Sequence, residues 1–216
     1  MRSVILATLA LLLAAPAAAA DVTLELAPEE SRYGSPTELT GTVTDAAGAP
    51  LAGVQVTLAG RRYPFKGEFR SLERTTTDAE GAYRFEREFE RNWQVRVLAP
   101  EERSRTERVY VFPRVELSFK ALNPRVIRLT QRYRVPHGTE LERPTLFYVG
   151  RRGRPTAPLA ATAEVVRKRS GRYVSRALVR IPTAWDGRFR YASCFRYTVG
   201  SGMGKPGARC PKRFRF

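Results

Sequence analysis

Short runs of alternating apolar and polar residues recur through residues 21–113. The alternation is clear in Val22 to Leu26, in Val54 to Leu58 and in Trp93 to Val97. A period of two, rich in β-branched and aromatic residues, is typical of a strand that is buried on one face. Further runs of this kind lie at 37–44, 71–77, 83–85 and 109–111. About seven short strands separated by turns favour an antiparallel β-sandwich.

Two segments between these runs have the chemistry of turns. Asp45 and Asp78 each open a turn, and Gly48 and Gly81 follow three residues later. The Asp side chain accepts hydrogen bonds from the backbone of its own turn, as in type I turns. With Glu80 these acids are also candidate calcium ligands, but a twelve-residue loop with alternating ligands is missing. We expect turn capping here, and we expect the chain to bind no metal and no cofactor.

Residues 114–216 repeat the pattern. Val115, Leu117 and Phe119 alternate with polar residues, as in an opening strand. In two later runs, apolar residues alternate with polar, mostly basic ones: Ile127, Leu129, Tyr133 and Val135 with Arg128, Thr130, Arg132 and Arg134, and Tyr173, Ala177, Val179 and Ile181 with Arg172, Arg176 and Arg180. We therefore predict an all-β chain of two tandem antiparallel β-sandwich domains, in residues 21–113 and 114–216.

Three stretches of strand and turn resemble a known family: Gly41 to Asp45, Gly48 to Val56 and Thr76 to Phe85. On these motifs, residues 38–98 resemble the carboxypeptidase regulatory-like, or transthyretin-like, sandwich domains. The resemblance implies a prealbumin-like sandwich that acts as an accessory or binding module without chemistry of its own. The second half is similar, more loosely, to bacterial Ig-like modules with an Asp-Gly-Arg-Phe corner, here Asp186 to Phe189.

The first 20 residues have the features of a secretory signal peptide. Arg2 gives a positive n-region, Val4 to Ala15 an apolar h-region, and Ala18-Ala19-Ala20 a cleavage site. The apolar run is shorter than the roughly 20 residues of a membrane-spanning helix. We expect cleavage after Ala20 and a secreted or periplasmic mature protein, residues 21–216, without a membrane span.

The two cysteines, Cys194 and Cys210, are expected to form a disulfide. An exported chain enters an oxidising compartment, and two cysteines allow one intramolecular pairing. They flank the stretch Gly200 to Gly207, whose many glycines offer little to pack, so we expect a flexible hairpin loop. The disulfide would tie the last two strands together across this loop and stabilise the fold by about 3 kcal/mol.

Charge is distributed very unequally along the chain. The formal net charge is +17, but residues 21–113 hold 13 Lys and Arg against 16 Asp and Glu, a net charge of −3. Residues 114–216 hold 24 against 5, a net charge of +19, and Arg2 supplies the remaining charge. Such an asymmetry indicates a domain boundary near Pro113 and directs the search for an anionic partner to the second half.

The strongest candidate site is the arginine-rich surface of this second half. The planar guanidinium of arginine binds carboxylate, phosphate and sulfate groups with two parallel hydrogen bonds. The alternative, a solvated basic surface that the acidic first half partly neutralises, remains open. The candidate polyanion-binding residues lie on two predicted strands and in two loop clusters: Arg128, Arg132, Arg134, Arg172, Arg176 and Arg180, then Arg151, Arg152 and Arg154, and Arg167, Lys168 and Arg169.

Other kinds of function find little support. His137 lies in a loop, no G-x-S-x-G nucleophile elbow occurs, and no glycine-rich segment links a strand to a helix. Tyrosines interleave with arginines as in nucleic-acid stacking platforms, but at apolar strand positions they are more often core residues. Trp93 is in phase with core valines, and Trp185 precedes a turn. We expect no enzyme, unless one cavity holds two carboxylates about 5–10 Å apart, as in glycoside hydrolases.

These features predict an exported, non-catalytic binding or structural protein. Its basic half would contact anionic envelope or extracellular polymers, such as wall polymers, lipopolysaccharide phosphates, acidic polysaccharide or DNA. The alternative is a structural or accessory subunit that contacts an acidic protein. Salt separates the two, because binding of a polyanion by several arginines weakens steeply as salt rises and an apolar interface does not.

Overall fold

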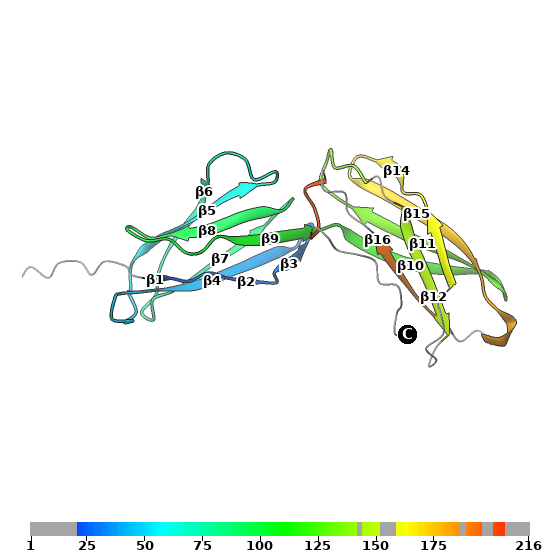
Figure 1. Ribbon diagram of the computed structural model, residues 1–216, viewed down its shortest axis with the longest axis horizontal. Helices are drawn as coiled ribbons and strands as arrows, with labels where there is room; N and C mark the ends of the chain where they lie inside the picture. The colour runs from blue at the N-terminus through cyan, green and yellow to red at the C-terminus, as the bar shows by residue number, and fades with distance from the viewer. Residues whose placement is uncertain (1–20, 142–143, 152–158, 186–188, 196–200, 206–216) are drawn as a thin grey trace, which may run out of the picture.

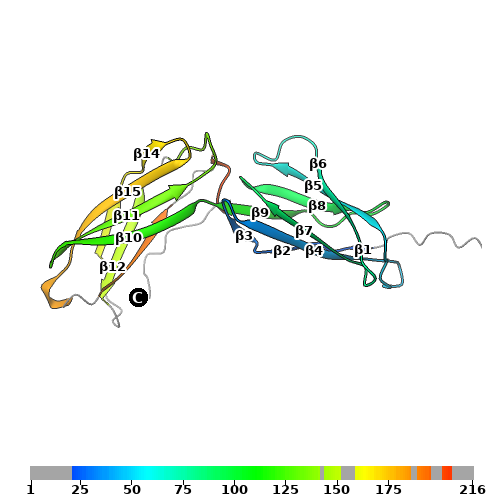
Figure 2. The same cartoon turned by 180° about the vertical axis from the view of Figure 1, so that it is seen from behind.

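The computed structural model describes residues 21–141, 144–151, 159–185, 189–195 and 201–205. Within these ranges every regular element is a β-strand, apart from the short 3-10 helix η1 (Thr183–Trp185). The all-β prediction is confirmed. Figures 1 and 2 show two groups of strands placed end to end, with β9 leading into β10 where they meet.

Nine strands form the N-terminal sandwich. One sheet has the order β1–β4–β2 with β7 paired to β4, and the other has the order β3–β9–β8–β5–β6. The pairing is antiparallel except between β3 and β9, which run parallel. The strands are β1 (Asp21–Val22), β2 (Glu25–Ala27), β3 (Glu30–Arg32), β4 (Pro36–Thr44), β5 (Gln55–Arg62), β6 (Arg70–Thr76), β7 (Ala82–Glu88), β8 (Trp93–Leu98) and β9 (Glu107–Phe112).

Seven strands form the C-terminal sandwich. Its sheets have the orders β10–β11–β15–β14 and β13–β12–β16 over the described residues, and all of their pairs are antiparallel. The strands are β10 (Arg114–Asn123), β11 (Val126–Arg134), β12 (Thr145–Arg151), β13 (Leu159–Ala163), β14 (Val166–Arg169), β15 (Arg172–Arg180) and β16 (Phe189–Phe195).

The core follows from the alternation in the sequence. On β8, Val95 and Val97 are fully buried, whereas Gln94 and Arg96, which alternate with them, stay partly exposed. Each buried valine or leucine contributes about 1.5–3 kcal/mol relative to an exposed one. Residues of both sheets meet in the core: Leu39 and Val43 from β4, Phe85 from β7, Val56 and Leu58 from β5, and Val109 and Val111 from β9.

The two expected turn caps are confirmed. One carboxylate oxygen of Asp45 accepts the backbone N–H groups of Ala47 and Ala49, both at 2.9 Å. Asp78 accepts the N–H groups of Glu80 at 3.1 Å and Ala82 at 2.8 Å. These acids therefore satisfy the backbone of their own turns.

Residues 201–205 connect the two sandwiches through Asn92. The side-chain amide of Asn92 donates to the carbonyl of Gly204 at 2.8 Å, and its oxygen accepts the N–H of Val111 at 2.8 Å. The backbone N–H of Asn92 donates to the carbonyl of Gly202 at 2.7 Å.

Met203 is buried in the same core cluster as Tyr133 and Val95. Hydrophobic core and buried hydrogen bonds thus run across the junction.

This arrangement corrects one expectation. Residues 201–204 are buried rather than part of a flexible hairpin loop. Gly202 allows the backbone to approach the Tyr63 ring closely, because a Cβ at this position would lie 2.9 Å from the ring. Gly202 also has a φ of +67°, which residues with a side chain rarely adopt. Cys194 lies on β16, but Cys210 and the expected signal peptide lie outside the described residues, so the disulfide and the cleavage site remain predictions.

Candidate anion-binding groove

The six strand arginines predicted as a candidate site lie on one face of one sheet. Arg128, Arg132 and Arg134 on β11 share the outward phase, and Arg172, Arg176 and Arg180 on β15 do the same. These two strands are neighbours, and their register places Arg134 opposite Arg172 and Thr130 opposite Arg176. Directly opposed residues of an antiparallel pair point to the same face, so the two groups of arginines form one surface.

Across this face runs an arginine row, Arg114–Arg134–Arg172. Arg114 on β10 is opposite Arg134 on β11, which is opposite Arg172 on β15. Like charges placed directly opposite each other destabilise a sheet by roughly 0.2–1 kcal/mol per pair. Among the described residues, the ion pairs within 4.0 Å involve Arg84 and Lys205 as cations and none of this row. No arginine of this row therefore forms an ion pair within 4.0 Å in the described part of the chain.

The row borders a concave cavity of about 680 Å³, which we call the arginine groove. Its volume lies within the roughly 300–1,000 Å³ range of binding sites for small ligands. Seven basic side chains and one acidic side chain line it, together with apolar residues of β10 and β15. The charged lining residues are Arg32, Arg114, Glu116, Arg132, Arg134, Lys168, Arg172 and Arg176.

The groove takes up only part of the predicted set. Of the candidate residues, it includes Arg132, Arg134, Lys168, Arg172 and Arg176. Arg128 and Arg180 lie on the same sheet face but outside the groove lining. Arg167 and Arg169 are exposed on β14, and Arg151 ends β12 in the other sheet. Arg152 and Arg154 lie outside the described residues. The groove therefore defines a more compact site than the predicted surface.

Two groove residues were missed by the sequence interpretation. Arg32 belongs to the acidic first half, and the parallel pairing of β3 with β9 places it opposite Phe112, close to the start of β10. Nothing local in the sequence indicates that long-range pairing. Arg114 was detectable in principle, because it directly follows the predicted charge boundary at Pro113. Both sandwiches thus contribute side chains to the groove.

Acidic side chains lie next to one end of the groove. A second cavity of about 220 Å³ is lined by Glu88 and Glu90 of the N-terminal sandwich and shares Arg114 and Arg134 with the groove. Both glutamates are exposed, and neither forms an ion pair within 4.0 Å in the described structure. Two carboxylates, those of Glu88 and Glu90, therefore line one cavity. They border two arginines, and their negative charge opposes binding of an external anion at this end.

The tyrosines near the arginines belong to the core, as expected. Tyr133 and Tyr173 are buried, and their hydroxyl groups form internal hydrogen bonds, with Thr145 and, at 2.7 Å, with the carbonyl of Thr139. A buried ring offers no face on which a nucleotide base can stack. Trp93 and Trp185 are each partly buried against one of the two cores.

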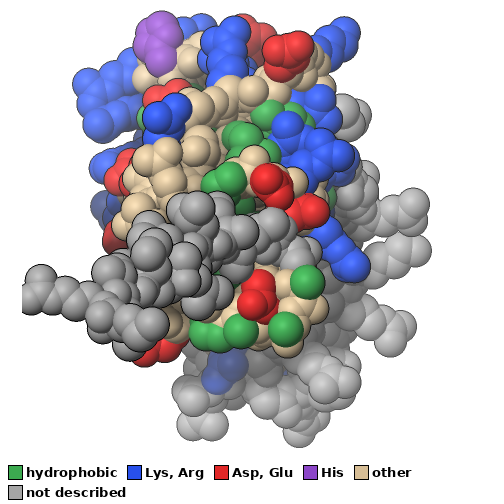
Figure 3. Space-filling view, turned by 90° about the vertical axis from the view of Figure 1, so that its left-hand side faces the viewer, with side chains coloured by type: hydrophobic (Ala, Val, Ile, Leu, Met, Phe, Trp, Pro, Cys, Tyr) green, Lys and Arg blue, Asp and Glu red, His purple; other side chains and the backbone are tan. Residues whose placement is uncertain are grey.

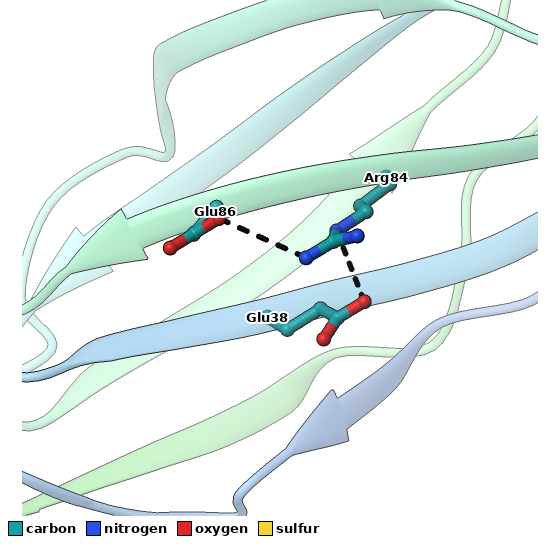
Figure 4. A network of polar contacts seen from close by, with 3 residues as sticks. All are labelled: Glu38, Arg84 and Glu86. Carbon is teal, nitrogen blue, oxygen red and sulfur yellow. Dashed lines mark ion pairs between the residues drawn. The ribbon is translucent and has the colours of Figure 1, made fainter.

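The charges of the N-terminal sandwich are arranged differently. Arg84 forms ion pairs with Glu38 at 3.0 Å and Glu86 at 3.8 Å on the surface of β4 and β7 (Figure 4). Figure 3, a view of the whole molecule from the end that carries β1, shows basic and acidic side chains interspersed. Exposed pairs of this kind contribute only about 0–1 kcal/mol each.

The guanidinium groups of Arg61 and Arg96 in the same sandwich contact an aromatic ring, that of Phe69. Their guanidinium carbons lie 4.7 and 4.1 Å from the ring centre of Phe69. The pKa of Arg96 is lowered by burial and further by the positive charges of Arg103 and Arg61. Among the described residues, no group of three or more His, Cys, Asp or Glu could hold a metal ion.

One family model matches a segment that includes most of the N-terminal sandwich. Residues 38–120 match the model of the carboxypeptidase regulatory-like domain. The resemblance predicted for residues 38–98 is thereby confirmed, and the match continues through β9 into β10. It covers less than half of the chain. No curated protein matches the sequence.

Solved structures that are similar to the chain include two bacterial adhesins and an α-2-macroglobulin. The Escherichia coli adhesin FdeC is 17% identical with a TM-score of 0.39, over 76% of this chain and 57% of that one. The Yersinia pseudotuberculosis adhesin InvE is 16% identical with a TM-score of 0.35, over 82% and 59%. Trypsin-activated α-2-macroglobulin from Escherichia coli is 15% identical with a TM-score of 0.34, over 84% and 13%. The chain thus spans less than two thirds of each of these proteins.

The described part of the chain contains no helix of the length and apolarity needed to cross a membrane.

Proposed function

We propose that the chain is an exported, non-catalytic binding protein whose arginine groove binds anionic groups of envelope or extracellular polymers. The observation that carries this proposal is the row Arg114–Arg134–Arg172, whose directly opposed arginines form no ion pair within 4.0 Å in the described structure. A row of directly opposed like charges costs stability, and an external anion would remove that cost. Phosphate, sulfate and carboxylate groups all fit the guanidinium fork.

The shape of the site supports a ligand with several negative charges. Seven basic side chains surround a single cavity, and Glu116 is the only acid among the described residues that line it. One small anion would neutralise only a fraction of this charge. A polymer or an end group with several phosphate, sulfate or carboxylate substituents would engage several forks at once and release bound counterions.

The proposal assigns different tasks to the two halves of the chain. We propose a domain boundary between Pro113 and Arg114, with residues 114–216 supplying most of the groove and residues 21–113 supplying Arg32. Support comes from the charge asymmetry and from the way β9 leads directly into β10 (Figure 1). We further propose that the signal peptide is removed after Ala20 and that Cys194 and Cys210 close the C-terminal sandwich.

Binding of a sulfated polysaccharide tests the proposal. The mature chain, residues 21–216, and its variant R134Q/R172Q are titrated with heparin by isothermal calorimetry at fixed low salt. We expect the variant to bind at least about tenfold more weakly, since each lost charge-assisted hydrogen bond contributes about 1.5–3 kcal/mol.

The matched control is R70Q/R74Q, which removes the same charge from exposed positions on β6. We expect its affinity to stay near that of the unsubstituted chain. Equal losses in both variants would mean that net charge alone attracts the polymer, and would overturn the assignment of the groove. Absence of heparin binding, with retained binding to an acidic protein, would favour the accessory-subunit alternative.

A further inference from the structure

Among the described strands, β10 is an edge of the sheet that carries the arginine row. It pairs with β11 on one side, and no other described strand pairs with it. Eight of its ten residues are exposed, and the other two, Leu117 and Ser118, are partly buried. A long, exposed edge strand is a template for pairing with another chain.

The edge also exposes large apolar side chains. Val115 is 39% exposed and Phe119 48%, and Leu122, at the register shift between Ala121 and Asn123, is 42% exposed. The ring of Phe119 is held in place by Tyr191 and Phe189 of β16, with ring centres 5.1 and 5.8 Å away. One side of a fixed aromatic ring therefore remains open to a partner.

The sequence of β10 is self-complementary in the antiparallel direction. When Ser118 is placed opposite Ser118 of a second copy, Glu116 falls opposite Lys120 on both sides of the centre. In the same register Leu117 falls opposite Phe119, and Val115 opposite Ala121. Opposite charges and apolar pairs directly across an antiparallel ladder each stabilise it.

We propose that β10 pairs antiparallel with β10 of a second copy of this chain, centred on Ser118. The interface is isologous, because each residue meets the symmetry-related surface of the partner. The two sheets β10–β11–β15–β14 then form one continuous sheet. A second copy is favoured over an unrelated strand because the charge pattern of β10 matches its own reverse.

The role of Lys120 distinguishes this proposal from protection of the edge. A lysine on an edge strand commonly prevents pairing, because an approaching strand would have to neutralise its charge. In the proposed register the partner supplies that neutralising carboxylate from Glu116. The same register keeps both arginine rows on one side of the joined sheet, since directly opposed residues share a face.

Charge swaps test the register. The dissociation constant of the mature chain is measured by sedimentation equilibrium at moderate salt for the unsubstituted chain, E116K, K120E and E116K/K120E. Each single substitution turns two opposite-charge pairs into two like-charge pairs, so we expect dimerisation to weaken by about tenfold. The double substitution restores opposite charges, and dimerisation should return to within about threefold of the original.

A cysteine at the symmetry axis gives a second, independent readout. In the proposed register Ser118→Cys faces itself, so mild oxidation should link two chains covalently. Ser71→Cys on β6, an edge strand of the other sandwich, serves as the control and should remain unlinked. A chain that stays monomeric at all accessible concentrations, or equal dimerisation of all four charge variants, would overturn the proposal.

Discussion

Arg134 is the residue at which stability and the proposed function oppose each other. It is exposed, it lies between Arg114 and Arg172 in adjacent strands, and no acid in the described structure pairs with it. A residue that serves only the fold would gain from being neutral here. In the proposed function, an external anion would offset this cost.

Replacing this arginine by glutamine should separate the two effects. We expect Arg134→Gln to raise the free energy of unfolding by about 0.2–1 kcal/mol, because two like-charge contacts are removed. Heparin binding should weaken in the same variant. Urea unfolding and calorimetry measure the two quantities. A clear loss of stability would show that Arg134 is held by favourable contacts and would remove the physical basis of the proposed site.

Glu88 and Glu90 place negative charge near two arginines of the groove, Arg114 and Arg134. They line the small cavity that also contains Arg114 and Arg134. Substitution of both by glutamine removes two negative charges from the ligand's surroundings, so heparin should bind several-fold more tightly. E73Q/E80Q, at exposed positions elsewhere in the N-terminal sandwich, is the control. Unchanged affinity in E88Q/E90Q would place the ligand away from this end of the groove.

At the level of elements, the strands were largely predictable and their partners were not. The alternation on β5, β8 and β11 predicts which residues are buried, because the period of a strand is a local property. The pairing of β11 with β15 joins residues 38 to 54 positions apart and depends on tertiary packing, which local patterns do not encode. The sequence therefore predicted the arginines of β11 and those of β15 on separate strand faces. Only the structure shows that they form one surface.

The segment 201–205 illustrates a second limit of sequence patterns. Its glycines suggested a flexible loop, but they serve a close approach to Tyr63 and Asn92. Arg32 had no local signal either, because it reaches the groove through the parallel pair of β3 and β9. In both cases the decisive contacts join the two sandwiches, which is the information that periodicity lacks.

Alanine substitution of two glycines tests the importance of this close approach. Gly202 and Gly138 both have positive φ, at +67° and +74°, so both substitutions carry backbone strain. Only Gly202 has a neighbour, the Tyr63 ring, within 4 Å of the added Cβ. We expect Gly202→Ala to be the more destabilising of the two, by about 1 kcal/mol or more. An equal loss of stability in Gly202→Ala and Gly138→Ala, measured by thermal unfolding, would mean that the Tyr63 ring can move to accommodate the added methyl group without destabilising the fold.

For the whole molecule, the unequal distribution of charge acquires a structural meaning. The +19 of residues 114–216 is concentrated in part along a groove, and the acidic first half contributes both Arg32 and the glutamates at the groove's end. Dimerisation through β10 would bring two such grooves to one side of a continuous sheet. A long polyanion could then occupy both, which raises its apparent affinity without any new type of contact.

The salt dependence of heparin binding tests the central claim most directly. Affinity is measured over a series of salt concentrations for the unsubstituted chain, for R134Q/R172Q in the groove and for R128Q/R180Q on the same face outside it. We expect a steep linear decrease of log affinity with log salt, with a shallower slope for R134Q/R172Q, because fewer counterions are released. R128Q/R180Q should keep the original slope. Equal slopes for both double variants, or an affinity independent of salt, would contradict an anion site in the arginine groove.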